Sequence, residues 1–144
     1  MTTIVLNTLT SAVTEYDWAF QSITPTHAGD ASGLYELGGD TDAGLEIDAR
    51  IDTGQRMWGE SLKRSISAVF VAARGVGQCA LTVHGQAAAW RYQFPIRPSG
   101  VSRSPVGKGI RENYIGFALE NTDGAAFSLD RIEVLDVTST SRRS

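Results

Sequence analysis

The alternation of apolar and polar positions is clearest in residues 114–137, where it predicts two β-strands around a turn. Early in this stretch, Ile115, Phe117 and Leu119 alternate with small or polar residues and would line one face of a sheet. Residues 121–124, Asn-Thr-Asp-Gly, tolerate the backbone angles of a tight turn. A β-hairpin is therefore the simplest prediction.

The second strand of this pair needs a bulge. Its apolar residues change parity between Leu129 and Ile132. One extra residue near Asp130 and Arg131 would return the later apolar positions to the same face of the sheet. Because a lone hairpin is only marginally stable in water, the rest of the chain must supply strands that pack against this pair.

Several other stretches have the pattern of short strands bounded by turn residues. Residues 45–51 alternate apolar and charged side chains, which predicts a half-exposed strand. Residues 66–73 form a short run rich in β-formers that ends at Gly75, and a buried strand is favoured over a helix. Residues 79–84 and 88–94 predict a further pair of strands. Shorter candidate strands are residues 4–6, 16–20 and 33–37.

Two segments are predicted to be mostly loop. Residues 22–44 are rich in Thr, Gly, Asp and Ser, and residues 101–112 form a basic, glycine-containing connection. Just before the first of these loops, Tyr16, Trp18 and Phe20 alternate with small or polar residues. We expect these three rings to be core side chains rather than a platform for a ligand.

The strand pattern as a whole defines a fold class. We count seven to nine short strands and no convincing long helix, which predicts an all-β, single-domain β-sandwich that is jelly-roll-like. The domain is expected over residues 1–138, followed by a short polar basic tail at 139–144. A chain of 144 residues can bury a core without disulfides, and the single cysteine, Cys79, is expected to be buried in it.

The composition is that of a globular protein. A hydrophobic content of 42% with 20% charged residues excludes a disordered chain. The first residues show no basic segment followed by a long apolar core, so no signal peptide is predicted. No apolar run approaches the roughly 20 residues that span a bilayer. We therefore expect folding in a cytoplasm and no membrane insertion.

Charge is unevenly distributed along the chain. Residues 1–60 carry ten acidic and two basic residues, whereas residues 61–111 carry eight basic and no acidic residues. The net charge is -3, and an acidic domain should be repelled by a polyanion, so nucleic acid is not expected as a partner. We expect the acidic and basic segments to pair, either within the fold or between neighbouring copies.

No pattern of residues points to catalysis. The chain has neither a Gly-x-Ser-x-Gly elbow nor a phosphate-binding Gly-x4-Gly-Lys-Ser/Thr loop. His27 and His84 lie far apart and lack the spacing of zinc ligands. Nothing singles out a pair among the sixteen acidic residues for glycoside cleavage. We therefore predict that the protein is not an enzyme and has no cofactor.

Asp40 and Asp42 are weak candidates for a calcium site. They begin an oxygen-rich run, but the ligands and the glycine that would continue a calcium-binding helical loop are missing. A solvated acidic loop is the favoured interpretation, and no metal site is predicted.

The candidates for a partner interface are one aromatic residue and several basic residues. Trp58 follows Met57 and is a candidate interface side chain, with a partly buried core residue as the alternative. The basic loop at 101–112 and the polar tail would present their cations to a partner surface. The interface candidates are Trp58, Arg103, Lys108, Arg111, Arg142 and Arg143.

The closing strands resemble a known group of β-sandwiches. Residues 114–117 and 127–134, with Asn121 and Gly124 between them, are similar to the last strands of galactose-binding-like jelly rolls and carbohydrate-binding modules. This likeness covers about 24 residues and largely encodes strand geometry. It implies a sandwich fold and suggests a sugar-binding module for host-surface glycans as one alternative function.

Most of the chain resembles the small virion proteins of long-tailed bacteriophages and Mu-like prophages, which are found among tail and baseplate components. The matching stretches are residues 15–20, 38–44, 97–100 and 109–114, with Arg142 and Arg143. The resemblance implies a structural protein without catalytic residues, located in the virion and assembled in the bacterial host cytoplasm. Its partners would be other virion proteins and copies of itself. A tail-tip or baseplate position is preferred, and a capsid decoration protein is the other alternative.

Overall fold

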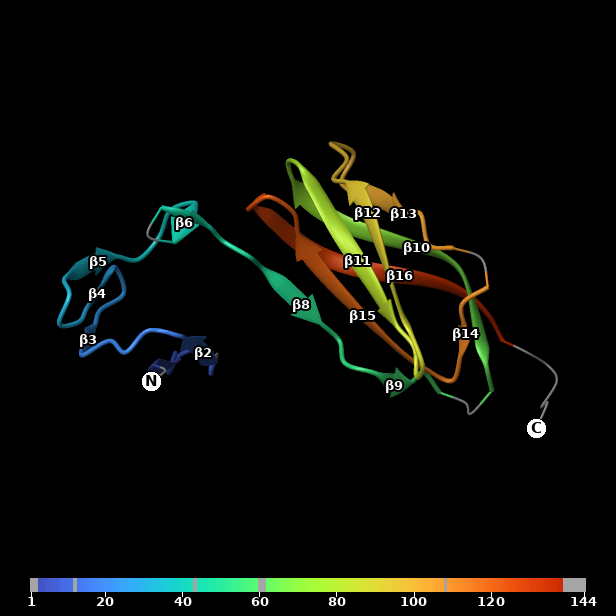
Figure 1. Ribbon diagram of the computed structural model, residues 1–144, viewed down its shortest axis with the longest axis horizontal. Helices are drawn as coiled ribbons and strands as arrows, with labels where there is room; N and C mark the ends of the chain where they lie inside the picture. The colour runs from blue at the N-terminus through green and yellow to red at the C-terminus, as the bar shows by residue number, and fades with distance from the viewer. Residues whose placement is uncertain (1–2, 12, 43, 60–61, 108, 139–144) are drawn as a thin grey trace. The chain divides into compact units, whose positions relative to one another are not determined.

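The computed structural model describes residues 3–11, 13–42, 44–59, 62–107 and 109–138. Every regular element in these ranges is a β-strand, which confirms the predicted all-β class (Figure 1). None of these residues belongs to a helix able to cross a membrane. The sixteen strands found in these ranges exceed the seven to nine expected because many contain only two to four residues.

Strand lengths range from two to twelve residues, and the longest strands are β10 and β16. In chain order the strands are β1 (Thr3–Leu6), β2 (Val13–Tyr16), β3 (Ser22–Ile23), β4 (His27–Gly29), β5 (Leu34–Glu36), β6 (Thr41–Asp42), β7 (Leu45–Glu46), β8 (Arg50–Asp52), β9 (Arg56–Met57), β10 (Arg64–Gly75), β11 (Gln78–His84), β12 (Ala89–Pro95), β13 (Val101–Ser104), β14 (Arg111–Glu112), β15 (Tyr114–Asn121) and β16 (Phe127–Thr138).

The chain has two compact units, the first unit Met1–Gly39 and the second unit Asp40–Ser144. The sequence predicted one sandwich domain over residues 1–138, and the structure places the sandwich in the second unit alone. The first unit has sheets of its own, and none of its strands joins the sandwich ladders.

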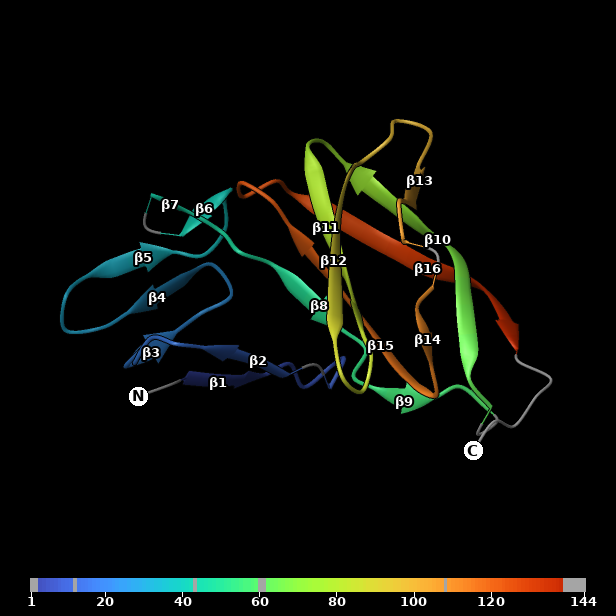
Figure 2. The ribbon, with the colours of Figure 1, turned by 45° about the vertical axis from the view of Figure 1, so that its right-hand side comes forward.

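The first unit contains two small antiparallel sheets. One consists of β1 and β2, and the other is the meander β3-β4-β5 (Figure 2). β5 confirms the short strand predicted at residues 33–37, whereas β3 and β4 were not predicted. Residues 17–20 are not a strand, yet the three predicted core rings do gather. Trp18 lies 4.9 Å from Tyr35 in an edge-to-face contact, and Phe20 lies 5.7 Å from Tyr16, between ring centroids. All four rings remain partly exposed.

The second unit contains a β-sandwich. One sheet has β10 at its centre, with β16 along one edge and β13 and β14 along the other. The opposing sheet has the order β12-β11-β15-β8, and β9 also pairs with β15. The two inner faces meet in a core built from alternate residues of the long strands. Its buried members are Ile66, Val69, Val71, Ala73, Cys79, Leu81, Val83, Phe94, Ile96, Ile110, Ile115, Phe117 and Leu119.

The closing strands form where they were predicted, but the hairpin prediction is wrong. β15 pairs with β11, β8 and β9 in one sheet, whereas β16 pairs with β10 in the other. Residues 122–126 therefore cross from sheet to sheet. The physical reason is that this crossing lets the apolar faces of β15 and β16 pack against each other, whereas a hairpin would leave both on one side of a single sheet.

A second crossing, from β10 to β11, packs against the first. A Cβ atom added to Gly75 would lie 2.4 Å from the carbonyl oxygen of Ala126, and one added to Gly77 would lie 2.8 Å from the Cβ of Ala125. Both glycines also have positive φ, at 146° and 101°. Glycine is required at this corner because the two crossing segments touch there.

The predicted bulge in β16 is confirmed. Ala72 pairs with Arg131 and Ala73 pairs with Leu129, so Asp130 is the extra residue on β16. The insertion keeps Leu129 and Ile132 on the core side of the strand, as the parity change indicated.

Two other predicted segments differ from the structure. Residues 45–51 are not one strand, because residues 47–49 bond instead to the side chain of Asn121: the amide of Ala49 donates to Oδ1 at 2.8 Å, and Nδ2 donates to the carbonyl of Ile47 at 2.7 Å. Within the expected loop at 101–112, β13 and β14 extend the sheet beside β10. The inward positions of β13 are buried serines, so the sequence lacked the apolar alternation of a strand.

Candidate functional site

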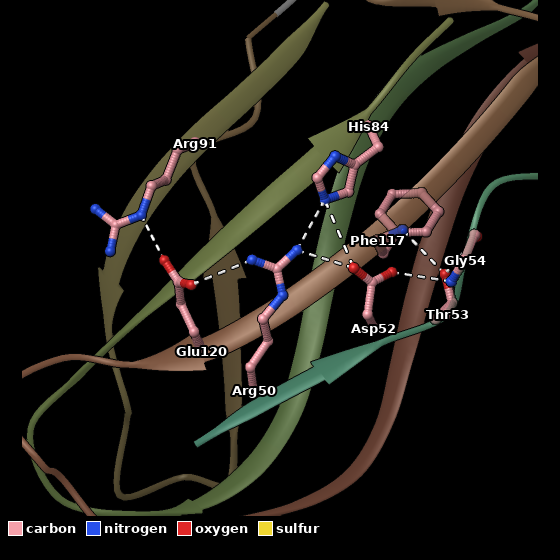
Figure 3. A network of polar contacts seen from close by, with 8 residues as sticks. All are labelled: Arg50, Asp52, Thr53, Gly54, His84, Arg91, Phe117 and Glu120. Carbon is pink, nitrogen blue, oxygen red and sulfur yellow. Dashed lines mark hydrogen bonds and ion pairs between the residues drawn. The ribbon is translucent and has the colours of Figure 1, made fainter. Parts of the chain in front are cut away.

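The outer face of the five-stranded sheet carries a row of charged side chains (Figure 3). Four neighbouring strands contribute to it, because the register places their outward residues side by side. Arg50 of β8 lies opposite Glu120 of β15, and Asp52 lies opposite Ala118, two residues further along β8. The outer-face network consists of Arg50, Asp52, His84, Arg91 and Glu120.

Ion pairs join these residues into one chain. Arg91 Nε donates to Glu120 Oε1 at 2.6 Å, and Arg50 Nη1 lies 3.9 Å from the other carboxylate oxygen of Glu120. Arg50 Nη2 donates to Asp52 Oδ2 at 2.9 Å. His84 Nε2 lies 3.8 Å from the same oxygen of Asp52 and 3.4 Å from Arg50 Nη2.

Small residues lie beneath this network. Ala80, Ala118 and Gly116 occupy outward positions on β11 and β15, and all three are buried although they face away from the core. Gly116 is covered by the backbone of Gly54 and Gln55.

The network shifts the protonation of its own members. The hydrogen bond from Arg50 lowers the pKa of Asp52, and the bond from the Gly54 amide, at 2.9 Å, lowers it further. The hydrogen bond to Asp52 in turn raises the pKa of Arg50. Both groups are therefore held in their charged forms.

The geometry of the network suits a structural clamp. β8 is an edge strand of three residues; the ion pair of Arg50 with Glu120 ties it to β15, and the contacts of Arg50 and Asp52 with His84 tie it to β11. The next residue, Thr53, adds two bonds to Phe117 at 2.9 Å, one through its amide and one through its hydroxyl. No cluster of three metal-ligating side chains occurs among the residues that the structure describes.

Trp58 lies at the margin of the core, between β9 and the sandwich interior. Its Nε1 donates to the carbonyl of Ile115 at 2.8 Å, and its ring meets Phe117 edge to face at 6.1 Å between centroids. The guanidinium of Arg56 stacks on the outer side of the ring, 4.1 Å from its centroid. The residue proposed as an interface side chain is thus anchored in the core and partly exposed.

A small apolar cleft of about 60 Å³ lies between the two sheets next to Trp58. Arg64 and Asp136 form an ion pair in its wall at 2.6 Å. The Nε atom of Arg64 is buried and has no hydrogen-bond partner. A buried donor without an acceptor is unfavourable, so an acceptor that reached Arg64 Nε would be stabilised. The lining residues are Trp58, Arg64, Ile115, Phe117, Val134 and Asp136.

The structure does not gather the other predicted site residues into one place. Asp40 and Asp42, the calcium candidates, are exposed, and Asp42 belongs to β6. Arg103 is exposed on β13 opposite Phe70, and Arg111 is exposed on β14 opposite Ser65. Lys108, Arg142 and Arg143 lie outside the described residues.

Sequence reasoning missed the outer-face network and the cleft. The alternation in residues 45–51 did place Arg50 on an outer face, but nothing in the sequence indicated that Glu120 and His84 would lie beside it. Cys79 was predicted correctly: it is a free, buried thiol, and burial raises its pKa.

Comparisons of the chain with protein-family models, with characterised proteins and with solved structures give no match.

Proposed function

We propose that the protein is a non-enzymatic structural component of a tailed-phage virion, located in the tail tip or baseplate, which assembles through contacts between subunits. One observation carries the assembly part of this proposal. The first unit buries too little apolar surface to stand alone and exposes large apolar side chains instead.

The described residues of the first unit hold one buried hydrophobic side chain, Ala28, which is 1% exposed. Folded units of fewer than about 40 residues usually need disulfides, metals or association with another chain. The only cysteine, Cys79, lies in the other unit, and the described residues offer no metal cluster. In this proposal a neighbouring protein surface supplies the missing stability. The large apolar side chains exposed in the first unit are Ile4, Leu6, Leu9, Val13, Ile23 and Leu34.

The charges of the two units support association between copies. The first unit carries four acidic residues and no lysine or arginine, a net charge of -4. The second unit carries the other twelve acidic residues and all thirteen basic ones, a net charge of +1. The sum is the -3 of the whole chain, and opposite signs on two units steer copies together.

The virion part of the proposal comes from the likeness of the sequence to small tail and baseplate proteins. A particle component made of many copies needs adhesive surfaces more than a reaction pocket, and the outer-face network is a clamp for an edge strand rather than a site for substrate. The partners would be copies of the chain and neighbouring virion proteins.

The resemblance of the closing strands to carbohydrate-binding modules suggested a glycan-binding module as the alternative function. No contact among the described residues favours this alternative. Such modules usually offer exposed aromatic rings. On the opposing sheet, Trp90 and Tyr92 pack against the core and Phe94 is buried in it, while Tyr114 is 38% exposed.

Mass spectrometry and antibody labelling of purified phage particles test the proposal. We expect the chain in intact virions, with label at the distal end of the tail. Absence from particles would contradict the proposal, and label over the head would identify a capsid decoration protein instead. Specific binding of one glycan by an isolated monomer would favour the sugar-binding module.

A further inference from the structure

The outer edge of β16 is open, with no strand paired to it among the described residues. β16 has twelve residues, and β10 is its only ladder partner among the described strands. Its other edge therefore presents unpaired backbone N–H and C=O groups, which attract strands from other chains. Residues 134–137 contain no proline or lysine, and the protective bulge of this strand lies earlier, at Asp130. Near its end, Leu135 and Val137 are 55% and 63% exposed.

The apolar cleft lies on the inner side of the same part of β16. Val134 and Asp136 line the cleft. Leu135 and Val137, which alternate with them along the strand, face the opposite side and are exposed. Side chains of a strand point alternately to the two faces of a sheet. A strand added beside residues 134–137 would therefore cover the cleft with one set of side chains and Leu135 and Val137 with the other. A polar group arriving with that strand could also accept from the buried Nε of Arg64.

β1 of the first unit has the properties of such a strand. It is uncharged, and β2 is its only partner in the described part of the chain, so one edge is open. Ile4 and Leu6 are exposed on one face, and Val5 lies on the opposite face. Both faces of β1 can therefore bury apolar side chains against a neighbour.

Arg56 is the charged group beside the cleft that favours the first unit as the occupant. The cations near the cleft are Arg56, which stacks on Trp58, and Arg64, which is paired with Asp136 in the wall. The first unit has a net charge of -4, including Glu15 opposite Ile4 on β2. On β16 itself Asp130, Glu133 and Asp136 outnumber Arg131, so the attraction of the acidic unit comes from Arg56 and not from the acceptor strand.

We infer that β1 of a second copy adds to the outer edge of β16 at residues 134–137 and covers the cleft beside Trp58. This inference rests on the proposed assembly function and specifies its contact. The contact is heterologous, since each copy offers β1 as donor and β16 as acceptor. Repetition of such a contact produces a ring if the rotation closes and a filament if it does not.

Sedimentation velocity of the full chain over a range of concentrations tests the contact with two variants. Ile4→Lys places a charge on the donor strand, and Val137→Lys places one on the acceptor strand. Each should weaken self-association roughly tenfold to a hundredfold, because one apolar side chain can no longer be buried. Both positions are exposed, so the variants should fold, which circular dichroism checks.

Matched controls place the same lysine on exposed apolar residues outside the contact. Leu9→Lys is the control within the first unit, since Leu9 is 95% exposed and lies outside β1. Val76→Lys is the control for the second unit, since Val76 is 81% exposed at the corner between β10 and β11. Neither control should change the association constant more than about twofold, because surface substitutions are usually near neutral.

Mixing the two variants is the most specific test. Ile4→Lys retains an intact acceptor and Val137→Lys retains an intact donor, so an equimolar mixture should form a dimer that cannot grow further. If the wild type associates and both variants associate as strongly as the wild type, this contact is wrong. The assembly proposal would not be contradicted by that result. A wild type that stays monomeric at every concentration would also overturn this contact. Absence of the chain from virions, by contrast, would contradict the proposed function itself.

Discussion

Gly116 shows how one residue positions the edge of the sandwich. A Cβ atom added there would lie 2.8 Å from the carbonyl oxygen of Gly54 and 3.0 Å from its carbon. These are backbone atoms of the segment that follows β8, so they cannot move aside as a flexible side chain would. The missing side chain of Gly116 is what lets this segment approach β15.

We therefore predict that Gly116→Ala lowers the free energy of unfolding by about 1–3 kcal/mol, the usual cost of overpacking. Urea denaturation of the full chain measures this change. Gly33→Ala is the matched control, because nothing lies within 4 Å of the added atom and its φ is not in the positive range. Equal stability of the two variants would contradict the close approach.

Asp52 gives the protein a pH dependence with a definite sign. Its pKa in the folded protein is lowered, first by the hydrogen bond from Arg50 and then by the amide of Gly54. A lowered folded-state pKa stabilises the fold above the unfolded value of about 3.9, and this contribution is lost as pH falls through the folded value.

We expect the stability of the wild type to fall below about pH 4, and that of Asp52→Asn to fall less steeply over the same range. Thermal unfolding measured between pH 2 and pH 7, on the order of ten points, would show the difference in slope. Asp48→Asn, at an exposed position before β8, controls for the loss of one carboxylate. If the melting temperatures of wild type and Asp52→Asn fall in parallel as the pH is lowered, this explanation is wrong.

At the scale of the element, the bulge at Asp130 sets the faces of β16. Leu129 lies opposite Ala73 and Ile132 lies opposite Val71 on β10. Both side chains pack on the core only because Asp130 is inserted between these two pairs. Removing that residue would force one half of the strand to turn its apolar side chains outward.

Deletion of Asp130 should accordingly cost about 1.5–3 kcal/mol for each apolar side chain that leaves the core. Asp130→Ala keeps the bulge and loses only the exposed ion pair to Arg74, so it should cost less than about 1 kcal/mol. Chemical denaturation of both variants separates the two effects. A deletion as mild as the alanine substitution would mean that the bulge does not determine the register.

The sequence predicts the strands of this fold better than their partners. Alternation located β15 and β16 and even the bulge, because the period of two is a local property of the chain. It could not show that residues 122–126 cross between sheets, since turn residues such as Asp123 and Gly124 permit a hairpin and a crossing alike. β13 was missed because its inward residues are serines.

The candidate site was less predictable for the same reason. Trp58 was identified as either an interface or a core residue, and its bond to Ile115 depends on β9 pairing with β15. The cleft unites residues from four separate stretches, and no local pattern marks their convergence.

At the scale of the whole molecule, the central question is where the first unit obtains its stability. Its described residues bury one alanine and expose six large apolar side chains, and its charge is opposite to that of the second unit. Such a unit should be ordered by a neighbouring copy and should open readily when the copies separate.

Hydrogen exchange of the full chain at low and high protein concentration measures this most directly. We predict that the amides of β1 exchange slowly in the concentrated, associated protein and much faster on dilution, while those of β11 stay protected throughout. Protection of β1 that is the same at both concentrations would contradict the role of a neighbouring copy in ordering the first unit.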